Sequence, residues 1–135
     1  MNKINQIYFQ ANFGKRPKKM EILRDLKKGK FCFLIGVDNW SIELQKSEFA
    51  SLHNLLLKIN KQFDEISDQL MEEELINLEI EQLPWYIELE GNKNDWSLRL
   101  VFESQEKTRS FEMYWPIPIA KNLFYEIKKM WESMD

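Results

Sequence analysis

The segment PIAKNLFYEIKKMWESM, residues 118–134, decides how the rest of the chain is interpreted, because its apolar pattern occurs twice. Its apolar residues recur every three or four positions: Ile119, Leu123, Ile127, Met130 and Met134. This spacing places them on one face of an α-helix, and Pro118 suits a first helical turn, where a missing N–H costs nothing. The segment therefore predicts a C-terminal amphipathic helix whose apolar face belongs to the core.

A second apolar stripe with the same plan lies 71 positions upstream. Its members, matched in order to Leu123, Ile127, Met130 and Met134, are Leu52, Leu56, Ile59 and Phe63. The residues in front of each stripe keep the same offset: Trp40 with Phe111, Ile42 with Met113 and Leu44 with Trp115. The pattern indicates a duplicated strand–helix unit.

Alternation of apolar and polar residues predicts strands in front of both helices. The predicted strands are residues 7–13, 31–37, 40–44, 78–81, 87–90, 96–103 and 111–115. Residues 14–19 read as a loop because Pro17 cannot donate to a ladder and the four charges repel each other. Residues 20–26 fit either a short helix or an edge strand. A long helix should begin at Ser47, a good N-cap, and end near residue 70 or 71.

These elements predict an α+β fold with antiparallel sheets, in which about four strands and one helix occur twice and the two helices pack together. We expect a single domain over residues 1–135, with an internal pseudo-repeat of about 1–71 and 72–135. The length of 135 residues and a hydrophobic content of 44% allow a substantial core.

Composition excludes several classes of protein. The polar N-terminal residues do not resemble a signal peptide, and no eighteen apolar residues run together. Cys32 and His53 are the single cysteine and histidine, which removes an internal disulfide and the usual zinc ligand sets. We expect a cytoplasmic protein, a monomer or a homodimer, with no membrane partner, cofactor or bound metal. His53 lies beside the apolar stripe and is expected at the core boundary.

Charge is distributed unevenly along the chain. The net charge is −3, yet residues 1–30 carry nine Lys or Arg against two acids, so the remainder sums to −10. Residues 64–90 contain ten acids and no Lys or Arg. The two regions can attract each other within or between subunits, or they can serve different partners.

The basic N-terminal region is a candidate site for single-stranded nucleic acid. Cations bind phosphates and aromatic faces stack on bases, and Tyr8, Phe9 and Phe13 lie nearby. The candidate residues are Lys15, Arg16, Lys18, Lys19, Lys27, Lys28 and Lys30. The alternative is a solvated basic loop, or one that pairs with the acidic half.

A predicted hairpin over residues 78–90 gathers carboxylates on one face. A turn between Pro84 and Trp85 would place Glu79 opposite Glu90 and Glu81 opposite Glu88. Opposed like charges destabilise a sheet, so this face needs solvent, neutralisation by Arg99, a cationic partner or a hard cation such as Mg²⁺ or Ca²⁺. No Asp-x-Asp loop supports the cation.

Two tryptophans are candidate contact residues. Trp85 is expected at a hairpin tip and Trp131 near the end of the chain, where an exposed indole would mark a contact surface. With the four glutamates they make up a candidate protein-interaction site.

Several segments together resemble a small uncharacterised cyanobacterial protein family. The residues that carry the likeness are Gly36-Val-Asp-Asn-Trp-Ser-Ile-Glu-Leu44 with Glu48-Phe49, Leu70-Met-Glu-Glu-Glu74, Trp85-Tyr-Ile-Glu-Leu-Glu-Gly91 and Ser97-Leu-Arg-Leu100. The likeness covers roughly residues 30–116. It implies a fold similar to the single-stranded-DNA-binding transcriptional regulators, such as the positive cofactor four coactivator and the plant Whirly proteins, but it supplies no functional residues.

Together, these features predict a non-enzymatic binding module, since no nucleophile or second base stands near His53. Single-stranded DNA or RNA is the first candidate ligand by fold analogy. The alternative is a protein–protein interaction adaptor that uses the acidic hairpin face and exposed aromatic residues.

Overall fold

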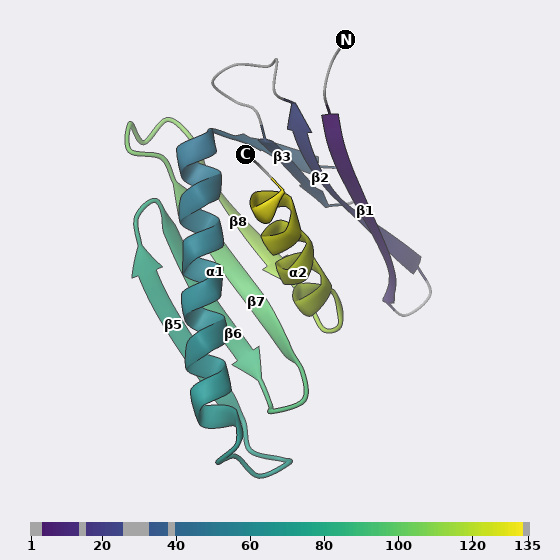
Figure 1. Ribbon diagram of the computed structural model, residues 1–135, viewed down its shortest axis with the longest axis vertical. Helices are drawn as coiled ribbons and strands as arrows, with labels where there is room; N and C mark the ends of the chain where they lie inside the picture. Colours follow the sequence, from purple (N-terminus) through teal and green to yellow (C-terminus); the bar gives the residue numbers. More distant parts are fainter. Residues whose placement is uncertain (1–3, 14–15, 26–32, 38–39, 134–135) are drawn as a thin grey trace. The chain divides into compact units, whose positions relative to one another are not determined.

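The computed structural model describes residues 4–13, 16–25, 33–37 and 40–133. This part of the chain forms two four-stranded antiparallel sheets and two helices, which confirms the predicted α+β class (Figure 1). The chain divides into two compact units. One unit comprises residues 1–50 and 125–135, and the other comprises residues 51–124.

The first unit contains a sheet whose strands follow the order of the chain. They are β1 (Ile4–Phe13), β2 (Arg16–Asp25), β3 (Phe33–Val37) and β4 (Trp40–Leu44). Arg16, Lys18 and Lys19 lie in β2, so the predicted loop of residues 14–19 is wrong for residues 16–19. Pro17 is tolerated because β3 pairs with β2 only from Met20 to Arg24, which leaves no ladder bond on that side at Pro17.

The helix α1 (Lys46–Ser67) begins and ends earlier than its sequence suggests. The carbonyl of Gln45 accepts from the amide of Phe49 at 3.0 Å, and the Gln45 amide donates to Glu48 Oε1 at 2.8 Å. This is the geometry of a capping box, in which a glutamate reaches back to the N-cap amide. Gln45 is therefore the N-cap, and Ser47 lies inside the first turn.

The second unit contains the sheet that carries the candidate site. Its strands, again in chain order, are β5 (Ile76–Gln82), β6 (Trp85–Gly91), β7 (Trp96–Glu103) and β8 (Ser110–Trp115). Antiparallel neighbours joined by short turns account for the alternation seen in the sequence, because one face of such a sheet packs on the core and the other contacts water.

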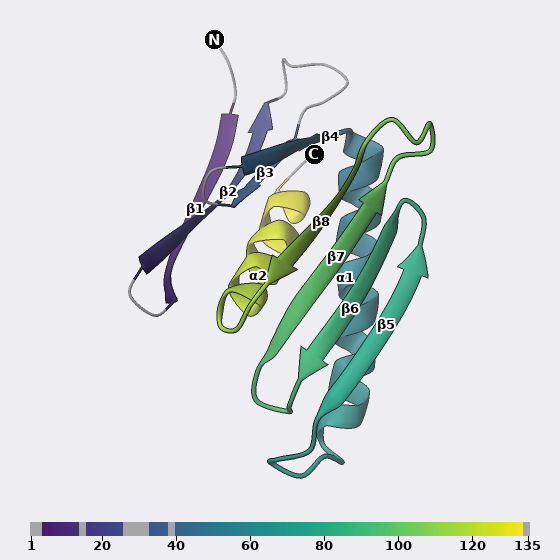
Figure 2. The same cartoon turned by 180° about the vertical axis from the view of Figure 1, so that it is seen from behind.

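Helical residues cover one face of this sheet within the second unit (Figures 1 and 2). The ring of Trp96 lies 6.2 Å from that of Phe63 on α1 and 6.3 Å from that of Phe124 on α2 (Ile119–Glu132). The strand residues facing the helices are buried, among them Trp85, Ile87, Leu100 and Trp115. The opposite face of the sheet carries the polar residues of the alternation.

The apolar stripes of the two helices are core, as their spacing predicts. Leu52, Leu56, Ile59 and Phe63 are at most 5% exposed, and Ile119, Leu123, Ile127 and Met130 at most 3%. Pro118 directly precedes α2, and the first helical hydrogen bond runs from the amide of Ala120 to the carbonyl of Pro116 at 3.0 Å. The helix faces therefore offer no groove to a ligand.

Candidate functional site

The outer face of the β5–β8 sheet gathers acidic side chains from all four strands. Residues of alternating register point to this face on each strand. The charged positions on it are Glu79, Glu81, Glu88, Glu90, Arg99, Glu103 and Glu112. Six carboxylates therefore share this face with one guanidinium, and we call it the acidic face.

The register of the β5–β6 hairpin differs from the one predicted. Glu79 pairs with Glu88, Glu81 with Tyr86 and Asn77 with Glu90. Leu83 and Pro84 form a two-residue loop closed by Gln82 and Trp85, so the turn is centred one position earlier than expected. Pro84 has no N–H to give to the ladder, which suits it to the loop itself.

This register also buries Trp85. Because Trp85 pairs across the sheet with Phe102, its side chain lies on the helix-covered face with Ile87 and is fully buried. The two rings are 4.9 Å apart. The expectation of an exposed indole at the hairpin tip is wrong, since the residue at the tip is Leu83, which is 76% exposed.

Arg99 lies at the centre of the acidic face and joins two strands on either side of its own. Its Nε donates to Glu88 Oε1 on β6 at 3.3 Å, and its Nη1 donates to Glu112 Oε1 on β8 at 2.8 Å. The bond to Glu112, followed by that to Glu88, raises the pKa of Arg99 above its usual range. Neutralisation by Arg99, one of the sequence-based alternatives, is confirmed for Glu88.

Tyr86 occupies the acidic face beside Arg99. The guanidinium carbon of Arg99 lies 5.6 Å from the centre of the Tyr86 ring, within the range of a cation–π contact. Burial raises the pKa of the Tyr86 hydroxyl, and the carboxylate of Glu79, which accepts a hydrogen bond from it, raises the pKa further. Both effects keep the hydroxyl protonated and able to donate.

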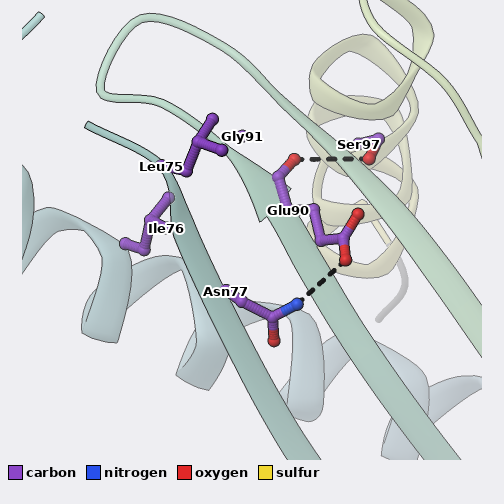
Figure 3. A pocket seen from close by; sticks show the side chains of 6 residues that line it. All are labelled: Leu75, Ile76, Asn77, Glu90, Gly91 and Ser97. Atoms are coloured by element: carbon purple, nitrogen blue, oxygen red, sulfur yellow. Dashed lines mark hydrogen bonds between the residues drawn. The ribbon is translucent and has the colours of Figure 1, made fainter. Parts of the chain in front are cut away.

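A pocket of about 430 Å³ opens at the end of β5, β6 and β7 (Figure 3). Its lining residues are Leu75, Ile76, Asn77, Glu90, Gly91 and Ser97. Asn77 Nδ2 donates to Glu90 Oε1 at 2.9 Å, and Ser97 Oγ donates to the Glu90 carbonyl at 3.3 Å. Asn77, Glu90 and Ser97, joined by these two hydrogen bonds, form the polar wall of the pocket, and Leu75 and Ile76 form the apolar wall.

Gly91 allows the chain to turn tightly beside this pocket. A β-carbon at this position would lie 2.6 Å from the Cα of Trp96 and still closer to the carbonyl oxygen of Asp95. Close approach of backbone to backbone is a reason for glycine in a strand. The pocket thus depends on a residue without a side chain.

The segment that leads into β5 is tied to the β6–β7 loop. Glu72 accepts from Asn94 Nδ2 at 2.9 Å and forms an ion pair with Lys93 at 3.2 Å. The bond from Asn94, then that from Lys93, lowers the pKa of Glu72. These contacts position Leu75, whose side chain is 83% exposed at the start of β5.

The remaining predicted site residues are divided between described and undescribed segments. Lys15, Lys27, Lys28, Lys30 and Cys32 lie outside the described residues. Trp131 is half-buried, with its ring 6.2 Å from that of Phe49. His53 is buried, with 7% of its surface exposed, whereas its expected place was the boundary of the core.

Some residues of the acidic face and of the pocket were not among the site residues predicted from the sequence. Tyr86, Glu112 and Tyr114 belong to the acidic face, and simple alternation along β6 and β8 would have found them. Ser97 and Gly91 line the pocket only because three strands end together, which no local pattern reveals. Within the described residues, no group of three or more His, Cys, Asp or Glu could hold a metal ion.

The fold and its polar face define an α+β protein with a charged sheet surface and two small pockets beside β5, the second formed by residues 71–74. Residues 15–130 match the family described as "Domain of unknown function (DUF1818)". The chain belongs to this family. None of the described helices is long and apolar enough to span a membrane.

A solved structure has a similar sequence and a similar fold. The chain is 31% identical to a protein of unknown function from the cyanobacterium Prochlorococcus sp. NATL2A, described as a member of the DUF155 family. The match covers 94% of this chain and 99% of that one, with a TM-score of 0.78. No match is found among the curated proteins. The resemblance to an uncharacterised cyanobacterial family is thereby confirmed.

Proposed function

We propose that this protein is a non-enzymatic binding module that uses its acidic face to hold a positively charged region of a partner protein. The observation that carries the proposal is the composition of that face, where six carboxylates share one guanidinium. Charge complementarity of this kind steers association and selects partners.

Glu79 and Glu88 lie opposite each other, and the repulsion between them favours binding of a cation at the acidic face. Like charges placed directly opposite destabilise a sheet, and Arg99 reaches Glu88 but donates its second bond to Glu112. Glu79, Glu81 and Glu90 are exposed. Lysine or arginine side chains of a partner would relieve the repulsion among these carboxylates.

Aromatic residues on the acidic face support a protein partner. Tyr114 is 60% exposed and pairs with Arg99 on the neighbouring strand. Tyrosine and arginine are enriched among residues that dominate binding energy. A surface that combines them with carboxylates suits a peptide or protein better than a phosphate backbone, which the carboxylates would repel.

The test uses a lysine-rich peptide as a defined cationic probe, with binding followed by isothermal titration calorimetry at low and moderate salt. The double substitution Glu79→Lys and Glu81→Lys should weaken binding by at least about tenfold at low salt, because a like charge at an interface costs several kcal/mol. The matched control is Glu65→Lys, which reverses an exposed charge on α1, away from the acidic face. Equal losses in both variants would contradict the proposal.

A second candidate function is binding of single-stranded DNA or RNA. Its support is the repeated arrangement of four antiparallel strands followed by one helix, together with the 71-residue offset between the apolar stripes. This arrangement favours a pseudo-repeat of about 1–71 and 72–135 and a likeness to the single-stranded-DNA-binding regulators. Three of the proposed phosphate ligands lie on β2. Lys18 and Lys19 are adjacent, and Arg16 lies two positions before Lys18.

Titration with single-stranded oligonucleotides, followed by tryptophan fluorescence at low and moderate salt, tests this candidate. Binding should weaken as salt rises, because phosphate contacts release counterions. Replacing Lys15, Arg16, Lys18 and Lys19 by glutamine should reduce both the affinity and the salt dependence. An unchanged signal at low salt would remove the nucleic-acid function.

A further inference from the structure

The strand β5 forms one border of its sheet. Among the described strands it pairs with β6 alone, and Figures 1 and 2 show it at the end of the β5-β6-β7-β8 order. A strand in this position has one row of backbone N–H and C=O groups that is not used by its own sheet. We propose that β5 binds an extended, basic segment of a partner protein as an added strand.

The hairpin register identifies the backbone groups on this border. Gln82 and Trp85 flank a two-residue loop, where the flanking pair exchanges both hydrogen bonds. Alternation along an antiparallel ladder then assigns Ile80 and Leu78 to β6. The N–H and C=O groups of Asn77, Glu79 and Glu81 are directed to the free border.

Several features that usually protect a border strand are absent from β5. Its sequence INLEIEQ contains no proline and no lysine, and its seven residues pair in continuous register with β6. Short strands, prolines and lysines are common means of blocking strand addition. Exposed leucines stand at both ends, Leu75 at 83% and Leu83 at 76%, where they would pack on an added strand.

The glutamates of β5 decide which strand can be added. Glu79 and Glu81 are both exposed on this strand, so a second copy of β5 would bring like charges together and be disfavoured. A segment with alternating lysine or arginine places opposite charges beside them. The inference rests on the proposed function, because it assigns a binding mode to the same cationic partner.

The pocket beside β5 provides a place for one side chain of the added segment. Leu75 and Ile76 can cover the aliphatic stem of a lysine or arginine, while the carboxylate of Glu90 lies on the polar wall (Figure 3). Long cationic side chains commonly bury their stems on apolar surface and keep the charge at a polar group. Occupation of the pocket would fix the register of the added strand.

The experiment compares two peptides that differ only in their backbone. One peptide alternates lysine and valine, and the other has the same sequence with N-methyl groups on alternate residues along one side. N-methylation removes donors and blocks the ladder while it preserves charge. When the methylated side of the peptide is the one that faces β5, the peptide should bind at least about tenfold more weakly than the unmodified peptide. Several backbone hydrogen bonds to β5 are then lost together.

Variants of Glu79 give a second measurement on the protein itself. Glu79→Pro removes an N–H that faces the free border, a position where strands tolerate proline, and should reduce affinity as strongly as N-methylation. Glu79→Gln keeps the N–H and should weaken binding by at most about fivefold through lost charge. On peptide addition, hydrogen exchange should slow at the amides of Glu79 and Glu81 and stay unchanged at Ile80.

The outcomes separate the binding mode from the function. Strand addition is overturned and the acidic face stands under one combination of results. The methylated peptide binds as tightly as the unmodified one, Glu79→Pro loses no more affinity than Glu79→Gln, and Glu79→Lys with Glu81→Lys still weakens binding by at least about tenfold. If the charge reversals have no effect, the proposed function fails, and strand addition by a basic segment fails with it. The inference is supported if affinity falls both in the backbone tests, with the methylated peptide and Glu79→Pro, and in the charge-reversal test.

Discussion

Glu79 and Glu88 lie directly opposite each other across β5 and β6, and a single arginine on the next strand, Arg99, bonds to only one of them. The acidic face is therefore a surface whose charges are incompletely balanced by its own residues. This relationship leads to predictions about its stability and its ionisation.

Replacement of Arg99 by leucine should destabilise the protein. The substitution removes the cation that separates Glu88 from Glu112, so the remaining carboxylates repel each other more strongly. Urea unfolding should show a lower midpoint, and the difference from the native protein should shrink as salt screens the repulsion. Lys61→Leu, which removes an exposed cation on α1, is the matched control. A salt-dependent loss of the same size in the control would refute this role of Arg99.

Tyr86 should ionise at a higher pH than a free tyrosine. Burial, then the carboxylates of Glu79 and Glu88, raise its pKa above the ordinary value of about 10. The stability that the neutral hydroxyl contributes is fully present below that ordinary value and is lost as pH rises through the folded-state pKa. Carbon-13 NMR of labelled tyrosine measures the titration.

The variant Glu79→Gln isolates one cause of that shift. It removes one nearby negative charge and should lower the pKa of Tyr86 toward the ordinary value without restoring it, because burial is the larger cause. Glu106→Gln, in the β7–β8 turn, should leave the titration of Tyr86 unchanged. A Tyr86 resonance that titrates at or below pH 10 in the native protein would contradict the prediction.

Trp85 should be essential to stability and should contribute nothing directly to binding. It is fully buried and packs against Phe102 and Phe111, whose ring centres lie 4.9 and 5.9 Å away. Trp85→Ala should lower the free energy of unfolding by about 3–5 kcal/mol through the cavity it leaves. Leu83→Ala, two residues earlier and largely exposed, should change it by less than about 0.5 kcal/mol. Chemical denaturation compares the two, and similar losses would argue against the register given above.

Gly91 should not tolerate a side chain. An added β-carbon would collide with backbone atoms of Asp95 and Trp96, so Gly91→Ala should cost about 1–3 kcal/mol as the β6–β7 turn is displaced. Ser97→Ala, on the opposite strand, loses a 3.3 Å hydrogen bond to the Glu90 carbonyl and should cost no more than about 1 kcal/mol. Thermal unfolding of both variants checks the order, and a neutral Gly91→Ala would show that the turn can relax.

Much of the architecture follows from local pattern. Helix periodicity identified the buried faces of α1 and α2, and alternation identified the strands of the second sheet, because one buried face per element imposes a fixed spacing of apolar residues. The same alternation placed Glu79 and Glu88 on a polar face. The strand of residues 16–25 was harder to predict, since its charges and its proline obscured a pattern that pairing with β1 stabilises.

The sequence by itself determined which side chains of each helix and strand face the core, since that choice depends only on the periodicity of the backbone. Tertiary structure alone decided which residues became neighbours across strands. A shift of the hairpin turn by one position buried Trp85, brought Glu79 opposite Glu88 and Asn77 opposite Glu90, and left Leu83 at the tip. Pairing between separate strands sets the register, and it also brings three strand ends together at Gly91 and leaves β5 at a sheet border. No local spacing of residues determines which strands pair or in which register.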